Sequence, residues 1–186
     1  MNIKNYDEKY REQVRYICKS TGPAEALTDE KTAAYIVNSY CNYYIDNEPD
    51  SCFVLTDDSD RAVGYILCSK NYKEYASKFG KYYEIVRKNA GINIVEVKAE
   101  HLVLKFFSEK YPAHLHIDIL DEYTGHGSGT LLMNTLLSHL KSEGVKAVML
   151  IVGSGNKPAV RFYKRNGFKV LISAFGGTVM GLKLQN

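Results

Sequence analysis

A glycine-rich turn from Tyr123 to Thr130 is the feature that most limits how this chain folds. Before it lies a run in which polar and apolar residues alternate, 114–120, as in a β-strand. After it, leucines recur at every fourth position, 132, 136 and 140, as on one face of a helix. A strand-to-helix turn of this kind leaves backbone N–H groups unpaired at the positive end of the helix, where they can bind a phosphate. The turn therefore predicts a ligand that carries phosphate groups.

The chain before this turn divides into short elements with clear boundaries. Asp7 predicts the N-cap of a first helix, and the polar turn 57–60 predicts a hairpin. A segment rich in Tyr and Lys, 70–111, stands between that hairpin and the strand before the turn. The expected elements are a strand at 3–6, helices over 8–19 and 29–46, hairpin strands at 52–55 and 62–67, and helices near 71–89 and 100–110.

The chain after the turn alternates helices with strands. Asn156 predicts an N-cap, and Gly167 predicts the end of the same helix. The expected elements are a helix to 142, a strand at 146–152, a helix opening at 156, and strands at 168–174 and 178–184. Together with the first half, this order predicts one α/β domain with a mixed sheet over residues 1–186.

Composition excludes several classes of protein. The net charge is +3 without a block of Lys or Arg, so that no nucleic-acid partner is expected. The longest apolar run, 147–152, is too short to cross a bilayer, and the N-terminus lacks a signal-peptide pattern. The 15 tyrosines fit a half-buried core, a binding cleft or the interface of a homodimer. A cytoplasmic protein without a zinc site or disulfides is expected because the four cysteines are scattered: Cys18, Cys41, Cys52 and Cys68.

Three classes of phosphate ligand bind glycine-rich turns at helix N-termini. A P-loop requires a Lys after the glycines, and this turn has none. A Rossmann dinucleotide site requires an acidic residue at the end of the next strand, but that strand ends here in apolar residues and Gly153. The remaining chain is also short for the second half of a Rossmann fold. The third class is acyl-CoA.

Two segments resemble the motifs of a known family that uses this third ligand. The segment 117–132 resembles motif A of the GNAT (Gcn5-related) N-acetyltransferase family, and Asn156 to Phe168 resembles its motif B. Within the family, the stretch that begins at Tyr111 to His116 is most similar to bacterial relatives of the acetyltransferase-like domain of O-GlcNAc hydrolase. The resemblance implies a GNAT-like single domain, in which helices flank a mixed sheet and a helical insertion precedes the central strand. It also implies acetyl-CoA (CoA) as the cofactor.

By this resemblance, the pyrophosphate of acetyl-CoA binds amides of the turn, and the pantetheine arm pairs with the preceding strand. Gly127 and Gly129 leave the room that the anion needs to approach the backbone. Thr124 stands where the family has Gln or Arg, so that one contact to the phosphates is expected to be weaker. A plain tight turn onto a helix is the alternative. The expected cofactor-binding residues are Ile117, Asp118, Ile119, Gly125, His126, Gly127, Ser128, Gly129, Thr130 and Asn156.

Catalytic residues follow from the resemblance and from the strand pattern. Tyr163 matches the proton donor of the family and is expected to hydrogen-bond the leaving thiolate; the alternative is a half-buried core tyrosine. Many amine-acetylating relatives have a Glu where this chain has Ile151, so that the general base must come from elsewhere. His114, His116 and Asp118 share one face of the strand, which makes His116 or Asp118 the predicted base. A polar strand surface facing solvent is the alternative.

Two functions remain open at this stage. One is an acetyl-CoA-dependent N-acetyltransferase that acts on a small-molecule or protein amine by direct transfer in a ternary complex, since no cysteine falls on the motifs. The other is a non-catalytic acetyltransferase-like module that binds CoA, or a protein partner, without turnover. The intact glycines, Asn156 and Tyr163 favour the enzyme, whereas Thr124 and Ile151 favour the module.

Overall fold

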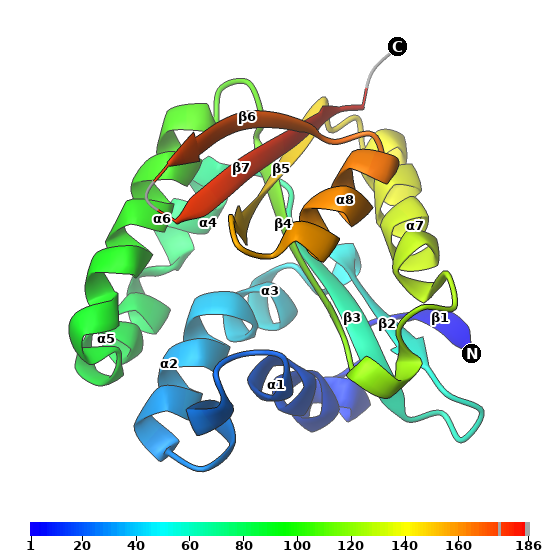
Figure 1. The fold of residues 1–186 in the computed structure, drawn as a ribbon, viewed down its shortest axis with the longest axis horizontal. Coiled ribbons are helices and arrows are strands. Elements are labelled where there is room, and N and C mark those ends of the chain that lie inside the picture. The colour runs from blue at the N-terminus through cyan, green and yellow to red at the C-terminus, as the bar shows by residue number, and fades with distance from the viewer. Residues whose placement is uncertain (175, 185–186) are drawn as a thin grey trace.

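Seven strands form one mixed sheet in the order β1-β2-β3-β4-β5-β7-β6 (Figure 1). The structure is a computed structural model that describes residues 1–174 and 176–184; positions 175, 185 and 186 of the domain predicted over 1–186 lie outside the described residues. Neighbouring strands are antiparallel, except that β4 and β5 are parallel. The strands are β1 (Asn2–Asn5), β2 (Cys52–Thr56), β3 (Ala62–Ser69), β4 (Ala113–Ile119), β5 (Ala147–Gly153), β6 (Lys169–Ala174) and β7 (Gly177–Lys183).

Helices pack on both faces of this sheet, α7 and α8 on one face and α1 to α6 on the other (Figure 1). The predicted α/β architecture, a mixed sheet flanked by helices, is therefore confirmed. Within the described residues, every helix is too short or too polar to cross a lipid bilayer. The helices are α1 (Arg11–Ser20), α2 (Glu30–Tyr40), α3 (Asn42–Asn47), α4 (Tyr72–Lys78), α5 (Gly80–Asn89), α6 (Ile94–Phe107), α7 (Ser128–Ser142) and α8 (Lys157–Arg165).

The strands build a separate hydrophobic core on each face because successive side chains of a strand point to opposite sides. In β3, Tyr65 and Leu67 belong to the core under α1 to α6, whereas Ile66 and Cys68 belong to the core under α7 and α8. In β4, Leu115 belongs to the second core. The alternation of β4 thus directs its polar side chains toward α1 to α6.

One long helix was expected over 29–46, and this expectation is wrong. The backbone leaves the helical conformation at Cys41, where φ is −133° and ψ is −64°. The Cys41 side chain is fully buried in the core, together with Tyr43 and Tyr44 of the next helix. The break between α2 and α3 therefore turns both tyrosines toward the sheet.

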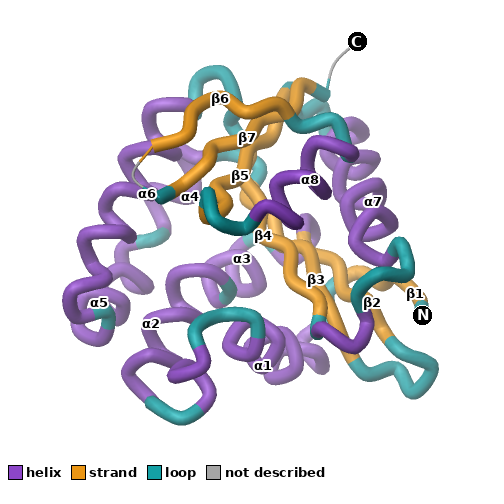
Figure 2. Tube along the Cα trace, in the orientation of Figure 1, coloured by secondary structure: helices purple, strands orange, loops and turns teal. Residues whose placement is uncertain are grey.

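The insertion 70–111 holds three α-helices where two were expected (Figure 2). The first expected helix is divided near Gly80 into α4 and α5. The second begins at Ile94, six residues earlier than expected, and ends at Phe107. Val97 and Leu104 fix α6 against the core, because both are buried there.

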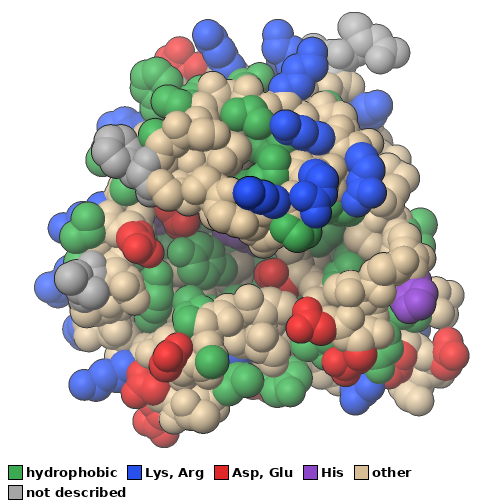
Figure 3. Space-filling view, viewed as in Figure 1, with side chains coloured by type: hydrophobic (Ala, Val, Ile, Leu, Met, Phe, Trp, Pro, Cys, Tyr) green, Lys and Arg blue, Asp and Glu red, His purple; other side chains and the backbone are tan. Residues whose placement is uncertain are grey.

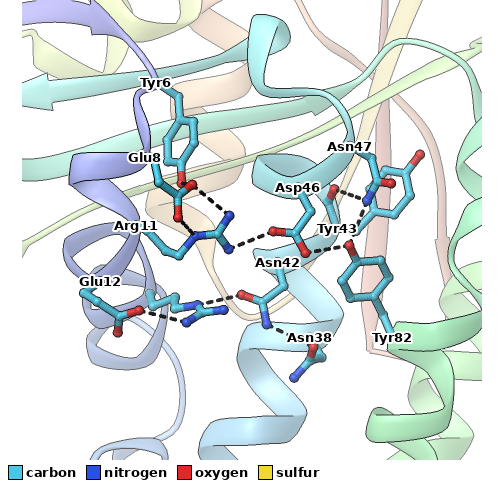
Figure 4. A network of polar contacts seen from close by, with 11 residues as sticks. Tyr6, Glu8, Arg11, Glu12, Asn38, Asn42, Tyr43, Asp46, Asn47 and Tyr82 are labelled. Carbon is cyan, nitrogen blue, oxygen red and sulfur yellow. Dashed lines mark hydrogen bonds and ion pairs between the residues drawn. The ribbon is translucent and has the colours of Figure 1, made fainter.

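A polar network fixes α5 against α1 and α3 (Figure 4). The guanidinium of Arg11 donates to Asp46 at 2.7 Å, and the Tyr82 hydroxyl donates to the other carboxylate oxygen at 2.7 Å. The side-chain amide of Asn47 donates to the Tyr82 oxygen at 2.8 Å. Hydrogen bonds to a charged, half-buried carboxylate are among the stronger ones in proteins. They hold the insertion in a defined position beside the sheet.

Candidate active site

The turn between β4 and α7 presents a row of unpaired backbone amides. Helix α7 begins at Ser128, and φ is 82° at Gly125 and 79° at Gly127, a conformation that glycine tolerates best. Among the described residues, the amides of residues 125–130 donate to no backbone carbonyl, and α7 has no side-chain cap. The Thr124 hydroxyl donates to the Asp121 carbonyl at 2.8 Å and thus closes the turn. Unpaired amides at the start of a 15-residue helix fit a phosphate group.

The glycines of the turn meet different requirements. A Cβ at Gly125 or Gly127 would have no atom within 4 Å, so that backbone conformation is what demands glycine there. A Cβ at Gly129 would lie 3.2 Å from the Phe162 ring of α8. Backbone conformation explains glycine at 127, and packing against α8 explains glycine at 129. The expected approach of an anion is a further reason at both positions.

Strand β4 diverges from β5 shortly after the two strands begin to pair. In the described sheet, β4 contacts β5 through Ala113 with Val148 and through His114 with Met149, and no further pair follows. The opposite edge of β4 stays paired with β3 as far as Ile119. The backbone of residues 117–119 therefore has a free edge, along which an extended ligand can add as a strand.

A gap opens between β4 and β5 where the two strands diverge, and helix α8 places Tyr163 on the α7 side of this gap. The side chain of Asn156 accepts a hydrogen bond from the Ala159 amide at 3.1 Å, which confirms the predicted N-cap. Tyr163 is 9% exposed, and its ring lies edge-on to Phe162 and Phe168. Burial raises the pKa of Tyr163, so that its hydroxyl stays protonated at neutral pH and can donate a hydrogen bond.

The polar face of β4 is covered by helices. His114 is 2% exposed. The Nε2 atom of His116 lies 3.0 Å from the Tyr44 hydroxyl, and Asp118 accepts a hydrogen bond from the Tyr65 hydroxyl at 2.5 Å. The alternative of a strand surface facing solvent is therefore wrong.

Burial also sets the charge of these groups. It lowers the pKa of His116 to about 4 and lowers the pKa of His114, so that both rings are neutral at pH 7. Burial raises the pKa of Asp118, although hydrogen bonds from Tyr65 and Thr21 oppose that shift. The predicted bases on β4 are thus a neutral imidazole with a low proton affinity and a carboxylate that already accepts a short hydrogen bond.

A narrow cavity of about 80 Å³, here called the inner cavity, lies where β4 and β5 diverge. Helices α2, α3, α4 and α6 supply its remaining walls. It brings His116 close to Ile151, although these residues come from different strands. The side chains that matter for the chemistry are Tyr40, Tyr44, Glu100, His114, His116 and Ile151.

A wider recess of about 470 Å³, here called the outer recess, shares Tyr40 and His116 with the inner cavity. Its other walls come from the end of α1, from α2 and from the beginning of α6. Glu96 and Asp118 give this recess a negative charge. The site therefore has an acidic approach on the α1 to α6 side.

Glu100 is a residue of the site that was not predicted from the sequence. Its carboxyl lines the inner cavity, where burial raises the pKa of Glu100 to about 7 and the Tyr40 hydroxyl opposes part of that shift. Glu96 and Glu100 lie one turn apart on α6 and thus share a face with buried Val97 and Leu104. Two acids one turn apart beside an apolar helix face are a sequence signal for buried carboxylates. The signal was not recognised because the expected helix began only at Glu100 and left Glu96 outside it.

Basic and acidic side chains are separated around the gap. Exposed Lys and Arg side chains gather over α8, and acidic side chains rim the hollow below it (Figure 3). The basic residues of α8 are Lys157, Arg161, Lys164 and Arg165. A phosphate-bearing ligand fits the α8 side, and a cationic ligand fits the opposite side.

Comparisons with known proteins agree with this arrangement. Residues 15–168 match the model of the acetyltransferase (GNAT) family. The crystal structure of SsHAT has a TM-score of 0.86 and 30% sequence identity, over 100% of this chain and 98% of that chain. The crystal structure of the PaiA N-acetyltransferase of Thermoplasma acidophilum in complex with coenzyme A has the same fold, with a TM-score of 0.64 and 16% identity over 98% of each chain.

Two curated relatives match over shorter stretches. The uncharacterized N-acetyltransferase MJ1207 of Methanocaldococcus jannaschii is 41% identical over 58 residues, 31% of this chain and 26% of its own length. The mycothiol acetyltransferase of Corynebacterium glutamicum is 37% identical over 54 residues, 29% of this chain and 18% of its own length. The matched stretch thus spans about a quarter or less of each curated relative.

The fold and the site together provide a gap between two parallel strands that suits an extended, phosphate-bearing ligand. The chain belongs to the acetyltransferase (GNAT) family. Its unpaired turn amides and the free edge of β4 are donors that suit the cofactor of this family, acetyl-CoA.

Proposed function

We propose that the chain transfers the acetyl group of acetyl-CoA to a small-molecule or protein amine by direct attack in a ternary complex. The divergence of β4 from β5 carries this proposal, since one gap connects the free edge at 117–119 with the inner cavity. The turn amides hold the pyrophosphate, and the β4 edge aligns the pantetheine arm. The thioester then ends beside the inner cavity, and the amine enters from the outer recess.

Tyr163 assists departure of the thiolate in this proposal. It lies on the face of the sheet opposite His116, so that leaving group and acceptor are served from different sides. A phenol with a raised pKa does not give up its proton fully to a thiolate, and a strong hydrogen bond to the developing charge is the role that fits.

The burial of the cysteines agrees with direct transfer of the acetyl group to the amine, without an acetylated cysteine as intermediate. All four are buried and free of disulfides. Burial raises the pKa of Cys52 and of Cys68, which leaves both as poorly nucleophilic thiols. A covalent acetyl-enzyme intermediate is therefore not part of the proposal.

One observation favours the rival function, a module that binds CoA or a protein partner without turnover. Ile151 lines the inner cavity at the position where many amine-acetylating relatives have a glutamate. A side chain without a titratable group cannot accept the proton of the acceptor amine. A CoA-binding module and the enzyme make the same prediction for acetyl-CoA binding and opposite predictions for transfer.

Calorimetry with acetyl-CoA and a transfer assay separate these functions. The acceptors are tyramine, spermidine, glucosamine and a lysine peptide with a blocked N-terminus. We expect Tyr163→Phe to lower kcat by roughly 10- to 100-fold with acetyl-CoA affinity within threefold of wild type, because only the leaving-group contact is lost. Tyr16→Phe, on an exposed tyrosine of α1, is the matched control.

The three possible outcomes of this experiment lead to different conclusions about the function. Transfer to an amine that depends on Tyr163 supports the proposed enzyme. Acetyl-CoA binding without transfer to any of the four acceptors supports the module instead. Failure of acetyl-CoA to bind at millimolar concentration contradicts both the enzyme and the CoA-binding module, and leaves only a module that binds a protein partner.

The finer assignments made from the sequence stay proposals of the same kind. They are a place near the bacterial relatives of the acetyltransferase-like domain of O-GlcNAc hydrolase, a cytoplasmic location, and a homodimer. Exposed apolar side chains of α6 support the homodimer, since Val95, Leu102 and Phe106 are 66%, 67% and 79% exposed. Sedimentation velocity tests it: a monomer at 100 μM contradicts the homodimer.

A further inference from the structure

The inner cavity has no carboxylate on β5, where many amine-acetylating relatives have one, but it contains a carboxylate from another element. Ile151 of β5 and Glu100 of α6 line the same cavity. Glu100 comes from the inserted helices, far from β5 in the sequence. Its position is fixed by the packing of α6, since Val97 is 1% and Leu104 is 8% exposed. The carboxylate therefore faces the cavity as a consequence of the fold.

We propose that Glu100 is the general base of the acetyl transfer and replaces the carboxylate that β5 lacks at Ile151. This inference rests on the proposed enzymatic function. It assigns the catalytic proton transfer to the insertion, whereas the alternating pattern of 114–120 predicted a base on β4.

The proton balance of the step is simple. The ammonium group of the acceptor gives one proton to the Glu100 carboxylate, which later releases it to solvent through the outer recess. The neutral nitrogen then attacks the thioester carbonyl carbon, so that a C–N bond forms and the C–S bond breaks. The nitrogen loses a second proton, which ends on the CoA sulfur. The products are the N-acetylated amine, CoA as its thiol and one proton.

The surroundings of Glu100 suit a base that works near neutral pH. Burial raises the pKa of Glu100 to about 7, which is close to the optimum for a general base at physiological pH. Glu96, on the same helix, raises it further. His114 and His116 of β4 and His101 of α6 all have a lowered pKa and are neutral at pH 7.

The other titratable groups that face Glu100 are tyrosines from three helices. Tyr35 and Tyr40 lie on α2, Tyr44 on α3 and Tyr75 on α4, and burial raises the pKa of each. They remain uncharged across the neutral range. The change of charge in this cavity between pH 6 and pH 8 therefore falls on Glu100.

Unpaired polar atoms give independent support for a polar occupant of the cavity. Both ring nitrogens of His114 and the hydroxyl oxygen of Ser39 are without a hydrogen-bond partner among the described residues. Both side chains line the inner cavity, and both are more than nine-tenths buried. Buried polar atoms without partners cost free energy, and an amine with an attendant water would satisfy them. A cavity of about 80 Å³ holds both.

The two bases expected on β4 are less suited to this step. His116 has a pKa of about 4, so that a proton taken from an ammonium is held weakly. Asp118 lines the outer recess instead of the inner cavity, and its carboxylate accepts the Tyr65 hydrogen bond. His116 and Asp118 are better suited to position the acceptor amine than to remove its proton.

The test is the pH dependence of kcat/KM for wild type and Glu100→Gln, at saturating acetyl-CoA and with the same four acceptors. We expect wild type to lose activity below pH 7, and Glu100→Gln to be roughly 100-fold slower at pH 7. The deficit should shrink as the pH rises, because the free amine then becomes abundant without a base. Glu100→Asp, with the carboxylate set back by one methylene, should be intermediate. Glu109→Gln, an exposed acid that follows α6, is the matched control.

Calorimetry with acetyl-CoA on each variant shows that the cofactor site is intact. Glu100→Gln activity within threefold of wild type, with the same loss of activity at low pH, overturns the assignment of Glu100 while leaving the proposed function in place. Wild type that binds acetyl-CoA but acetylates none of the acceptors overturns the proposed function itself, and the role of Glu100 with it. A large deficit that is constant with pH overturns the base and shows a structural role.

Discussion

The two sides of the gap between β4 and β5 are built by different means. On the proposed cofactor side, the groups expected to bind are backbone amides of one short turn and one strand edge, and the turn depends on glycines at 125, 127 and 129. On the proposed acceptor side, the groups are side chains brought together from α2, α3, α6 and β4. A backbone site can be read from a short run of residues, whereas a side-chain site exists only once the fold has formed.

This difference predicts that the two sides fail in different ways. Damage to the cofactor side should come from changes of backbone conformation and leave the acceptor cavity unchanged. Damage to the acceptor side should come from changes of single side chains and leave acetyl-CoA affinity unchanged. Four variants test this contrast, beginning with the largest expected effect.

The largest effect is expected from Gly127→Val. A β-branched residue does not tolerate a φ of 79°, so that the turn must change conformation and its amides must point elsewhere. We expect acetyl-CoA affinity to fall by at least about 100-fold in calorimetry, since several charge-assisted hydrogen bonds are lost together.

Gly144→Val is the matched control for Gly127→Val. Gly144 follows the other end of α7, has a φ of 72°, and offers equally open space to a Cβ. Both variants should lose about 1 to 3 kcal/mol of unfolding free energy from backbone strain. An equal loss of acetyl-CoA affinity in both variants would show that general destabilisation, and not the turn amides, determines binding.

The contrast also explains what could be predicted from the sequence. The turn, its helix and the cap at Asn156 are local patterns, and the structure has these elements where they were expected. The break at Cys41 could not be predicted, because burial of that side chain in the core decides it. Glu100 was missed because the expected helix began only at that residue, and because its place in the inner cavity depends on how the whole of α6 packs in the fold.

The second effect concerns stability. It measures how much free energy of unfolding is lost because the Glu100 carboxyl is buried on the acceptor side. Burial favours the neutral form of Glu100, whose pKa rises from 4.5 to about 7 on folding. The folded state therefore binds more protons than the unfolded state, and stability falls as the pH rises from about 4.5 to about 7. We expect Glu100→Gln to be more stable than wild type by about 3 kcal/mol at pH 8.

Urea unfolding of both proteins at pH 4.5 and pH 8 measures this difference. At pH 4.5 the carboxyl of wild type is largely neutral when folded, and the two proteins should differ by less than about 0.5 kcal/mol. A difference that does not change with pH would mean that Glu100 is not held in its neutral form by the fold.

The third effect separates the two carboxylates of the acceptor side. Asp118→Asn removes a charge from the outer recess and weakens the hydrogen bond from Tyr65. We expect kcat/KM to fall by less than about tenfold, with the loss of activity at low pH retained. Tyr65→Phe should have an effect of similar size, because it removes the same hydrogen bond. If Asp118→Asn abolishes the pH dependence instead, the base lies on β4 and the contrast between the elements fails.

The smallest effect is expected from the basic surface of α8. Lys157 and Arg161 are exposed, so that their attraction for the phosphates of acetyl-CoA is screened by solvent and salt. We expect the double variant Lys157→Gln and Arg161→Gln to weaken acetyl-CoA binding by about two- to fivefold in 50 mM salt and by less than twofold in 500 mM salt. Lys73→Gln with Lys78→Gln, on exposed positions of α4, is the control of equal charge. An equal loss in that control would assign the effect to net charge, and the cofactor side would then depend on its backbone amides alone.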